Sequence, residues 1–506
     1  MRVNCTAGRL SAAVAALCML GTPCASVACT GVYAGRRTTA DGTILLGHTV
    51  DSATWTKCHR VEIAPRVENA PGRTFASTRN KFRWNLPATT WKCVSTPRLS
   101  SFGDGGMNSA CVNERGLSVS GTVTGHANKA VIKGDPYNTA SGAGENSLPI
   151  LLALCCSTAR EAVGLLGKVV AECGHFNGEI YLLADAEEAW YVEVYTGHQW
   201  AAVQMPEDKV ACWGNEYMLT SFRMDSPDAM HSPGLLDVAR KAGTLKDAKD
   251  GCVDLCAAYA APHREDRHIR TWYGHRLLAP SSAGEFDLVR SYPLFYAPDR
   301  KVTTLDLMEL MRSRNEGTKY CPEDSQDKTH RTIGTTKQSS AHVIEIAPAL
   351  PAPLRCTIWL ALANCEHSVF MPLNAAIDGV ASMYAADQTG QPRRDWSVAG
   401  HAFRRLCALS ETDRRLYGAA VRAFWHAREV AYLRDYRALQ ASAAKEWEAS
   451  PEKARKRLTE WLVSEQVRNF TDANRLFDEL TWQIIENNRT KGETSPKWSP
   501  APFKVL

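Results

Sequence analysis

The chain has 506 residues, a hydrophobic content of 44%, a charged content of 22% and a formal net charge of +5. This composition is that of an ordinary globular protein and argues against a disordered chain. Arg2 and Arg9 lie in the first 28 residues, so the remaining chain carries +3 (5 − 2), which is too little over this length to indicate a nucleic-acid-binding protein.

Residues 1–28 have the features of a secretory leader. Arg2 gives a positive start, the run 10–20 is almost entirely apolar, and Ser26-Val27-Ala28 places small residues where a signal peptidase reads them. After this segment, no apolar run approaches the ~20 residues that a membrane-spanning helix needs. The sequence therefore predicts an exported protein, periplasmic or extracellular, without a transmembrane segment in its mature chain.

Cleavage after Ala28 would place Cys29 at the start of the mature chain, with a free α-amine beside its thiol. Such a residue combines a nucleophile and a base, which is typical of a catalytic site. Three interpretations of Cys29 stay open on these residues alone: a structural cysteine, a lipoprotein anchor and an N-terminal nucleophile. Against the anchor, Ser26 stands where a lipobox usually has leucine, and lipidation would normally block the amine.

The other cysteines argue against a dense disulfide framework. Three of the 17 cysteines belong to the leader, and without Cys29 an odd thirteen remain, so at least one free thiol is expected. Cys252 and Cys256 are four residues apart, but no histidine and cysteine cluster completes a metal site around them. The sequence predicts no metal and no organic cofactor.

Strand and helix patterns alternate through residues 29–395, and the short connections favour antiparallel pairing. Asp41-Gly42 is a hairpin signal, and Thr158-Ala-Arg-Glu161 is a capping box before apolar residues at helical spacing. In chain order the expected elements are strands at 30–34, 43–48 and 116–121, a helix at 158–172, a hairpin of strands at 180–184 and 190–194, a loop at 322–340, and strands at 342–346 and 357–362.

From about Trp396 the pattern becomes helical. Ser450-Pro451 combines an N-cap with a first-turn proline, and the expected helices lie within 403–439, 451–470 and 476–485. The sequence therefore divides into three parts after the leader: a mixed region at 29–395, a helical region packed on it at 396–489, and a loose tail at 490–506.

Eight short segments occur in an order that resembles one family of hydrolases. They are Cys29-Thr-Gly31, Asp41 to Ser52, Asn113 to Leu117, Ala159 to Val163, Ala189 to Glu193, Thr196 to Trp200, Gly214-Asn-Glu216 and Arg267 to Trp272. Together they resemble the N-terminal-nucleophile cysteine hydrolases, which include choloylglycine hydrolase and penicillin V acylase. The chain is most similar to the dipeptidase branch, the dipeptidase A type, over nearly all of its mature length.

The resemblance implies an α+β fold, the four-layer αββα sandwich of these hydrolases, with a helical C-terminal extension. Cys29 would be the nucleophile, and Asn215 the side-chain donor to the oxyanion. Asp51 would orient the α-ammonium group and assist return of the proton. Arg267 would support the site electrostatically or bind the substrate carboxylate, and its neighbour Arg270 can exchange roles with it.

Two positions depart from the acylase relatives. His48 stands where they place an arginine, three residues before Asp51, and Thr122 stands where they often carry a second oxyanion asparagine. Both differences argue against bile-salt or penicillin V acylase activity and leave the dipeptidase interpretation. His48 and Arg270 are expected to bind substrate, and His198 to have a structural or substrate-side role, because the α-amine already supplies the base.

The predicted function is an exported cysteine-type dipeptidase that works through an acyl-enzyme on Cys29. Its partner is a small peptide substrate, and it can form a homo-oligomer. A second possibility is a C–N amide acylase of the same fold that acts on an N-acyl amino acid or a related amide. A third is a lipid-anchored binding protein of this fold without catalytic activity.

Overall fold

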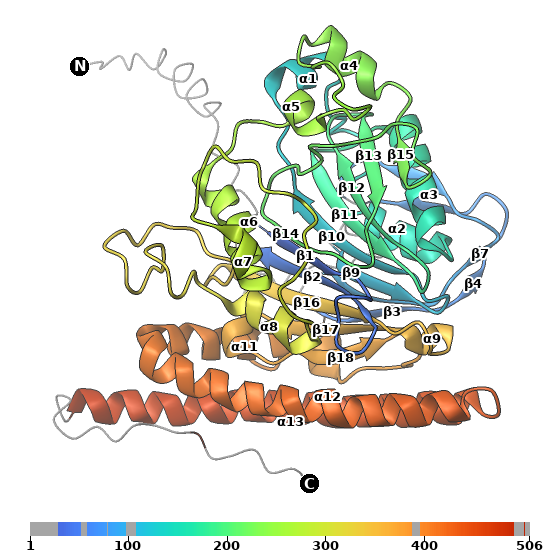
Figure 1. Ribbon diagram of the computed structural model, residues 1–506. Helices are drawn as coiled ribbons and strands as arrows, with labels where there is room; N and C mark the ends of the chain where they lie inside the picture. The colour runs from blue at the N-terminus through green and yellow to red at the C-terminus, as the bar shows by residue number, and fades with distance from the viewer. Residues whose placement is uncertain are drawn as a thin grey trace, which may run out of the picture.

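A computed structural model describes residues 29–51, 58–77, 79–97, 108–386, 395–489 and 500. The predicted leader, the predicted tail except Pro500, and the side chain of Thr122 lie outside these described residues. The architecture is mixed α+β, as predicted, with antiparallel sheets and long C-terminal helices (Figure 1).

Two antiparallel sheets form the centre of the molecule. The first has the order β14-β1-β2-β16-β17-β18, and the second has the order β15-β13-β12-β11-β10-β9-β8-β3. The strands of the first sheet are β1 (Thr30–Ala34), β2 (Ile44–Asp51), β14 (Val210–Trp213), β16 (Gln338–Ile346), β17 (Cys356–Leu362) and β18 (Met371–Asn374). Those of the second are β3 (Glu62–Ala64), β8 (Cys93–Pro97), β9 (Asn108–Asn113), β10 (Ser118–Thr124), β11 (Glu179–Ala184), β12 (Ala189–Val194), β13 (Trp200–Gln204) and β15 (Ala229–His231).

The predicted hairpins are confirmed. β1 pairs with β2 across a turn in which Gly42 takes a φ of +76°, a conformation that suits glycine. β11 pairs with β12 in the same antiparallel manner. The predicted strand at 342–346 is longer than expected, since β16 already begins at Gln338, which pairs with Asp51 at the end of β2.

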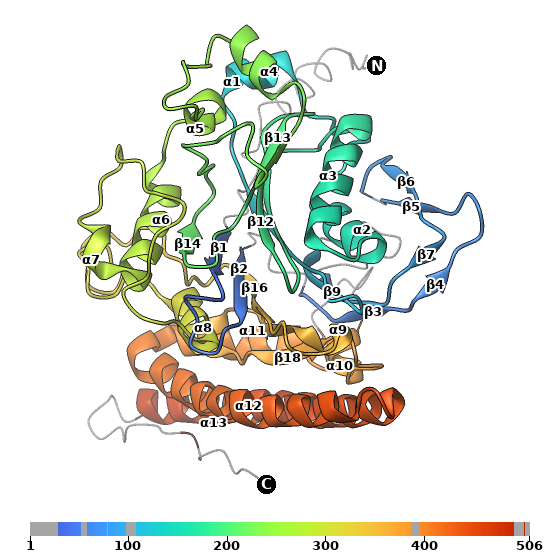
Figure 2. The same ribbon diagram turned by 45° about the vertical axis from the view of Figure 1, so that its right-hand side comes forward.

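The two sheets lie face to face and bury a common core between them (Figures 1 and 2). Trp213 of β14 illustrates this packing, because its ring meets Tyr191 of β12 edge-on at a centroid distance of 5.0 Å. A side chain at Gly31 of β1 would overlap the Trp213 ring, so the glycine leaves the space that the indole occupies.

Helices cover the outer face of the eight-stranded sheet. α2 (Leu148–Cys155) packs on β9 and β10, and α3 (Ala159–Cys173) packs on β11 and β12. The predicted capping box is present, with reciprocal bonds between Thr158 and Glu161. A second apolar core fills the space between these helices and the sheet.

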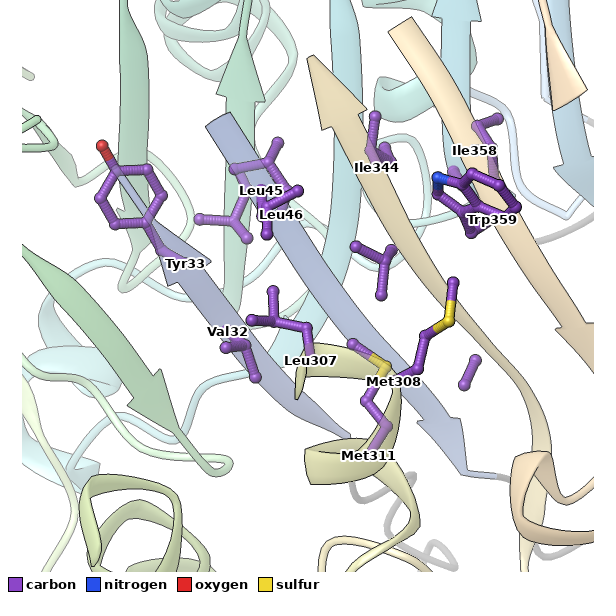
Figure 3. Packing of buried hydrophobic residues seen from close by; sticks show 14 of the residues in the cluster. Val32, Tyr33, Leu45, Leu46, Leu307, Met308, Met311, Ile344, Ile358 and Trp359 are labelled. Carbon is purple, nitrogen blue, oxygen red and sulfur yellow. The ribbon is translucent and has the colours of Figure 1, made fainter. Parts of the chain in front are cut away.

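The outer face of the six-stranded sheet is covered by α6 (Glu265–Leu278) and α8 (Thr304–Arg312). In Figure 3, Leu307 and Met311 of α8 lie against Val32 of β1 and its neighbours. The approach is close: a side chain at Gly47 of β2 would lie 2.3 Å from the Met311 methyl group. Across the molecule from one side to the other, the order of layers is helices, sheet, sheet, helices (Figure 2).

The C-terminal region is a layer of helices beside β17 and β18 (Figure 1). Its elements are α11 (Ala399–Ser410), two short turns at Glu411–Asp413 and Arg414–Gly418, α12 (Ala419–Glu446) and α13 (Pro451–Arg489). The expected break between 470 and 476 is wrong, because α13 is one helix of 39 residues. The intervening residues are polar but contain no glycine or proline, and buried Ala473 keeps the segment on the core.

The remaining elements are short. They are the strands β4 (Val67–Glu68), β5 (Thr74–Ala76), β6 (Arg83–Asn85) and β7 (Thr89–Thr90), the helices α1 (Lys129–Gly134), α4 (Leu235–Lys241), α5 (Leu255–Tyr259), α7 (Pro280–Ala283), α9 (Ala352–Arg355) and α10 (Ser382–Ala385), and a 3₁₀ turn at Cys365–His367. Among the described residues, no helix combines the length and the apolar character needed to cross a membrane.

Candidate active site

Cys29 is fully buried and immediately precedes β1, between β14 on one side and β2 on the other. In the antiparallel register, Gly31 pairs with Trp213. Continuing this register by two residues brings Cys29 opposite Asn215. On the other side Thr30 pairs with Thr49, so Cys29 is level with the last two residues of β2, which ends at Asp51. The topology alone therefore brings three of the predicted site residues to one edge of the first sheet.

Arg270 of α6 reaches the same point and is fully buried. Its Nη1 donates to the carbonyl oxygen of Cys29 and, at 3.1 Å, to the hydroxyl of Thr30. Its Nη2 donates to Oδ1 of Asn215 at 2.8 Å, and its Nε donates to the carbonyl oxygen of Asp266 at 3.0 Å. The planar guanidinium thus fixes Cys29 and Asn215 relative to each other.

Two glycines allow α6 to lie this close to the sheet. A side chain at Gly274 would lie 2.0 Å from the sulfur of Cys212 on β14. A side chain at Gly214 would lie 2.4 Å from the carbonyl oxygen of Arg267. Because neither contact leaves room for a Cβ atom, glycine at both positions is what brings Arg270 within reach of β1.

The orientation of the Asn215 amide follows from its partners. A guanidinium can only donate, so the oxygen Oδ1 faces Arg270. The nitrogen Nδ2 then donates to the carbonyl oxygen of Thr124 at 3.1 Å. Asn215 therefore presents its N–H groups toward the end of β10.

Asp51 is buried and forms an ion pair with Arg331, a residue 280 positions away in the chain. Burial raises the pKa of the Asp51 carboxyl, and the positive charges of Arg331 and Arg270 oppose that rise. Arg331 is not predictable from the sequence, because it lies in the polar segment 322–340, where no periodicity distinguishes one arginine from another.

The environment of Cys29 favours the neutral thiol. Burial raises its pKa far above the ordinary value, and the negative charges of Asp51 and Glu145 raise it further, while the Asp51 backbone N–H and the Arg270 charge oppose the rise without cancelling it. A thiol of this kind is not a thiolate at neutral pH, so it needs a base to become a nucleophile. Burial also lowers the pKa of Arg270 to about 10, which leaves the guanidinium charged at neutral pH.

Of the two arginines considered for the electrostatic role, Arg270 and not Arg267 lies beside Cys29. The family resemblance puts Arg267 first in the electrostatic role, but Arg270 is the one that contacts Cys29. Arg267 is half-buried one turn earlier in α6. Together with burial, its charge lowers the pKa of His126 to about 4, so its guanidinium lies near His126.

The two predicted histidines lie outside the group around Cys29. His48 is buried between the sheets, where its ring is 5.3 Å from that of His342, which bonds Ser120 at 2.8 Å. His198 is nearly half exposed and bonds the carboxylate of Asp135 at 2.7 Å. The substrate-binding roles predicted for His48 and His198 stay predictions.

Three groups of side chains in the described part of the chain have the composition of a metal site. Each consists of glutamates and histidines whose ligand atoms lie within 4.8 Å of one another. The groups are Glu216, His263 and His268; Glu309, His426 and Glu429; and Glu366, His367 and Glu411. In the second and third groups arginines already neutralise the carboxylates. The first adjoins Asn215 and is held by hydrogen bonds to α6.

The chain is similar in sequence to known proteins. A probable dipeptidase B of Streptococcus pyogenes serotype M1 is 28% identical over 388 residues, which cover 73% of this chain and 76% of that protein. A probable dipeptidase of Salmonella dublin is 26% identical over 397 residues, covering 77% and 90%. Among solved structures, a variant of conjugated bile acid hydrolase from Clostridium perfringens aligns with a TM-score of 0.33 and 10% identity, covering 68% of this chain and 92% of that chain.

The model of Peptidase family C69 matches residues 28–426, well over half of the chain. This match confirms the predicted family, and with it the prediction that the chain is an enzyme of the cysteine peptidase type. The chain belongs to peptidase family C69.

Proposed function

We propose that this peptidase is an exported dipeptidase whose nucleophile is Cys29, and that the acyl-enzyme forms on its sulfur. The observation that carries the proposal is the convergence of Arg270, Asn215 and Asp51 on the one cysteine that follows the predicted leader. The names of the relatives, probable dipeptidases, support the dipeptide as the substrate. The four-layer αββα assignment belongs to the same proposal and is supported by the order of layers in Figure 2.

The base in this proposal is the α-amine of Cys29 itself. In the unprocessed chain this nitrogen is the amide of the Ala28–Cys29 peptide bond and cannot accept a proton. Once the bond is cut, a free amine of pKa ~7.7–8.0 accepts the thiol proton. The ammonium so formed would then lie near the Asp51 carboxylate, which would stabilise and orient it.

The thiolate attacks the carbonyl carbon of the dipeptide, a C–S bond forms, and the carbonyl oxygen becomes an oxyanion. Asn215 donates an N–H to this oxygen, and Arg270 holds Asn215 in place while adding positive charge. The C–N bond then breaks, and the departing amine takes the proton held by the α-ammonium. Water attacks the thioester with the α-amine as base, which releases the first amino acid and restores the thiol.

The test uses the purified, exported protein. Intact-mass analysis is expected to find a chain that begins at an unmodified Cys29, and a panel of dipeptides and N-acyl amino acids is expected to show turnover of dipeptides. Cys29→Ala should abolish turnover while export and thermal unfolding stay as in the wild type. A Cys29→Ala variant with full turnover would reject the mechanism.

The same measurements separate the two alternatives. Preferred turnover of N-acyl amino acids over dipeptides would identify an amide acylase. A diacylated Cys29 with a blocked amine, together with no turnover, would identify a lipid-anchored binding protein. The unprocessed precursor, in which the Cys29 nitrogen is an amide, is expected to be inactive in either enzymatic case.

A further inference from the structure

The segment that carries Asn215 is an irregular stretch buried inside the protein. All six residues from 214 to 219 are buried, although none belongs to a helix or a strand. Buried backbone outside regular structure leaves N–H and C=O groups that need partners from elsewhere. In this segment, which we call the Asn215 turn, Glu193 accepts from two of the backbone N–H groups, and the buried side chain of Glu216 ties the segment to α6.

Glu193 holds the Asn215 turn to the eight-stranded sheet. It lies on β12 and is fully buried. Its carboxylate accepts from the backbone N–H groups of Met218 and Leu219 and from the hydroxyls of Tyr191 at 2.6 Å and Tyr195 at 2.7 Å. Burial raises the pKa of Glu193 to about 7 against the effect of these bonds. A carboxylate offers about four acceptor positions when ionised, so these four donors would saturate the ionised form.

Glu216 holds the other side of the Asn215 turn to α6. It follows Asn215 in the chain, and its carboxylate accepts from the hydroxyl of Thr271. It also bonds Nδ1 of His268 at 3.0 Å and Nδ1 of His263 at 2.9 Å. Burial alone would raise the pKa of Glu216, but the bonds to His263 and His268 outweigh it and lower the pKa to about 2, so the carboxylate is ionised at neutral pH.

The two carboxylates act on the two structures that contact Asn215. Its amide nitrogen bonds Thr124 of the eight-stranded sheet, and its amide oxygen bonds Arg270 of α6. A turn that slipped along either surface would break one of these contacts. Glu193 fixes the turn on the sheet, and Glu216 fixes it on the helix, so the pair sets the position of the Asn215 amide relative to Cys29.

We propose that Glu193 and Glu216 are positioning residues that hold the Asn215 amide where the oxyanion forms, so that they serve the reaction without touching the substrate. This inference rests on the proposed function, since it takes Asn215 as the oxyanion donor. It gives a chemical role to Glu193, which closes the sequence segment Ala189 to Glu193 and has no part in the mechanism above.

A double-mutant cycle between Glu193→Gln and Asn215→Ala tests the proposal. Glutamine keeps the size of the side chain but can accept on one atom only, so the backbone bonds to the turn weaken. Asn215→Ala is expected to lower kcat ~10²- to 10³-fold, as loss of one oxyanion donor does. Glu193→Gln is expected to lower it ~10- to 100-fold, because a shift of about 1 Å can cost that much. In the Asn215→Ala background, Glu193→Gln should change kcat less than about twofold.

The control is Glu429→Gln, which makes the same change at a buried carboxylate far from the turn that also accepts a backbone N–H, from Phe370 at 2.8 Å. Its effect on kcat, if any, should be the same with and without Asn215. If Glu193→Gln lowers kcat by the same factor with and without Asn215, as the control is expected to do, the proposal is overturned. A Glu193→Gln variant with the kcat of the wild type would overturn it too.

A second readout separates positioning from a general loss of structure. Alkylation of Cys29 by iodoacetamide passes through no oxyanion, so its rate in Glu193→Gln and Glu216→Gln should stay within about twofold of the wild-type rate while kcat falls. Equal losses in both rates would contradict the proposal. If Glu193→Gln does not fold, Tyr195→Phe replaces it, since this variant removes one bond to Glu193 and should show a smaller fall in kcat that disappears in the Asn215→Ala background.

The outcome does not depend on the identity of the substrate. A wild-type protein that turns over no member of the panel rejects the proposed function, and hydrogen exchange of residues 214–219 then decides the role of the carboxylates. Faster exchange of this segment in Glu193→Gln and Glu216→Gln than in Glu429→Gln supports the positioning role of the two carboxylates. Unchanged exchange in both variants overturns that role.

Discussion

Two networks of buried charge differ in how their arginines are neutralised. Beneath the C-terminal helices, Arg312 pairs with Glu309 and Glu429, and Arg314 pairs with Glu366 and Glu411. Beside Cys29, Arg270 donates only to uncharged acceptors among the described residues: two backbone carbonyls, a hydroxyl and an amide. The carboxylate of Asp51, whose charge also acts on Arg270, is paired with Arg331.

Under the proposed function, this difference separates the network that takes part in the chemistry from the one that does not. In the C-terminal network each charge meets its opposite, so little field remains for a third group. At Cys29 the positive charge of Arg270 is directed at a thiol, a carbonyl and an amide, where it can stabilise negative charge that develops during a reaction. Buried charge alone marks neither function, since Arg270 and Arg312 are both fully buried; what differs is that the hydrogen bonds of Arg270 leave its charge uncompensated by a bonded carboxylate.

The largest expected effect comes from removing that uncompensated charge. Arg270→Met is expected to lower kcat/KM by at least ~10³-fold, because it removes a charge beside the oxyanion and also the bond that orients Asn215. Steady-state kinetics on the best dipeptide of the panel measure this. Arg267→Met is the matched control on the same helix, and its loss should be below ~10-fold and mainly in KM. Equal losses of kcat/KM in the two variants would show that Arg270 and Arg267 contribute equally to catalysis, against the prediction.

The compensated network should respond in stability rather than in rate. Glu411→Gln leaves Arg314 and His367 with a neutral partner, and removing one member of a buried pair costs about 3 kcal/mol or more. Chemical denaturation at pH 7 is expected to show this loss in the free energy of unfolding. The kcat of the folded variant should equal that of the wild type, and a lower kcat would mean that the network also serves the active site.

The same pair predicts a pH dependence of stability. Burial alone would raise the pKa of Glu411, but the bonds from His367 and Arg314 outweigh it and lower the pKa to about 2. Because the folded pKa is below the unfolded value of ~4.3, the stabilisation is complete above the unfolded pKa and is lost as the pH falls toward 2. The wild type should lose about 3 kcal/mol over this range, and Glu411→Gln should lose correspondingly less.

Local patterns in the sequence predicted much of the fold. The strands β1, β11 and β12 and the helix α3 follow from alternation, turn residues and a capping box, all of which act over a few residues. The continuity of α13 was missed, because a polar stretch looks like a connection when nothing local ends the helix. The continuity of α13 comes instead from its length and its packing on the core.

The sequence could predict the arrangement of the candidate site only where the chain order brings residues together. Cys29 directly precedes β1, Asp51 ends β2 and Asn215 follows β14, three neighbouring strands, and the family motifs contain all three residues. The choice between Arg267 and Arg270 depends on how closely α6 approaches β14, which Gly214 and Gly274 decide through contacts that no local pattern reveals. Arg331 reaches Asp51 from a loop 280 residues later, so neither spacing nor periodicity could have found it.

The smallest expected effect concerns His198, which lies in neither network. Its bond to Asp135 is half exposed, and bonds of this kind contribute about 1 kcal/mol or less. His198→Ala should therefore lower the free energy of unfolding by that amount and leave kcat unchanged. The predicted substrate-side role requires more, namely a KM that rises several-fold for dipeptides while the reactivity of Cys29 toward iodoacetamide stays the same. An unchanged KM would leave His198 the structural partner of Asp135, because a side chain that binds substrate cannot be removed without weakening that binding.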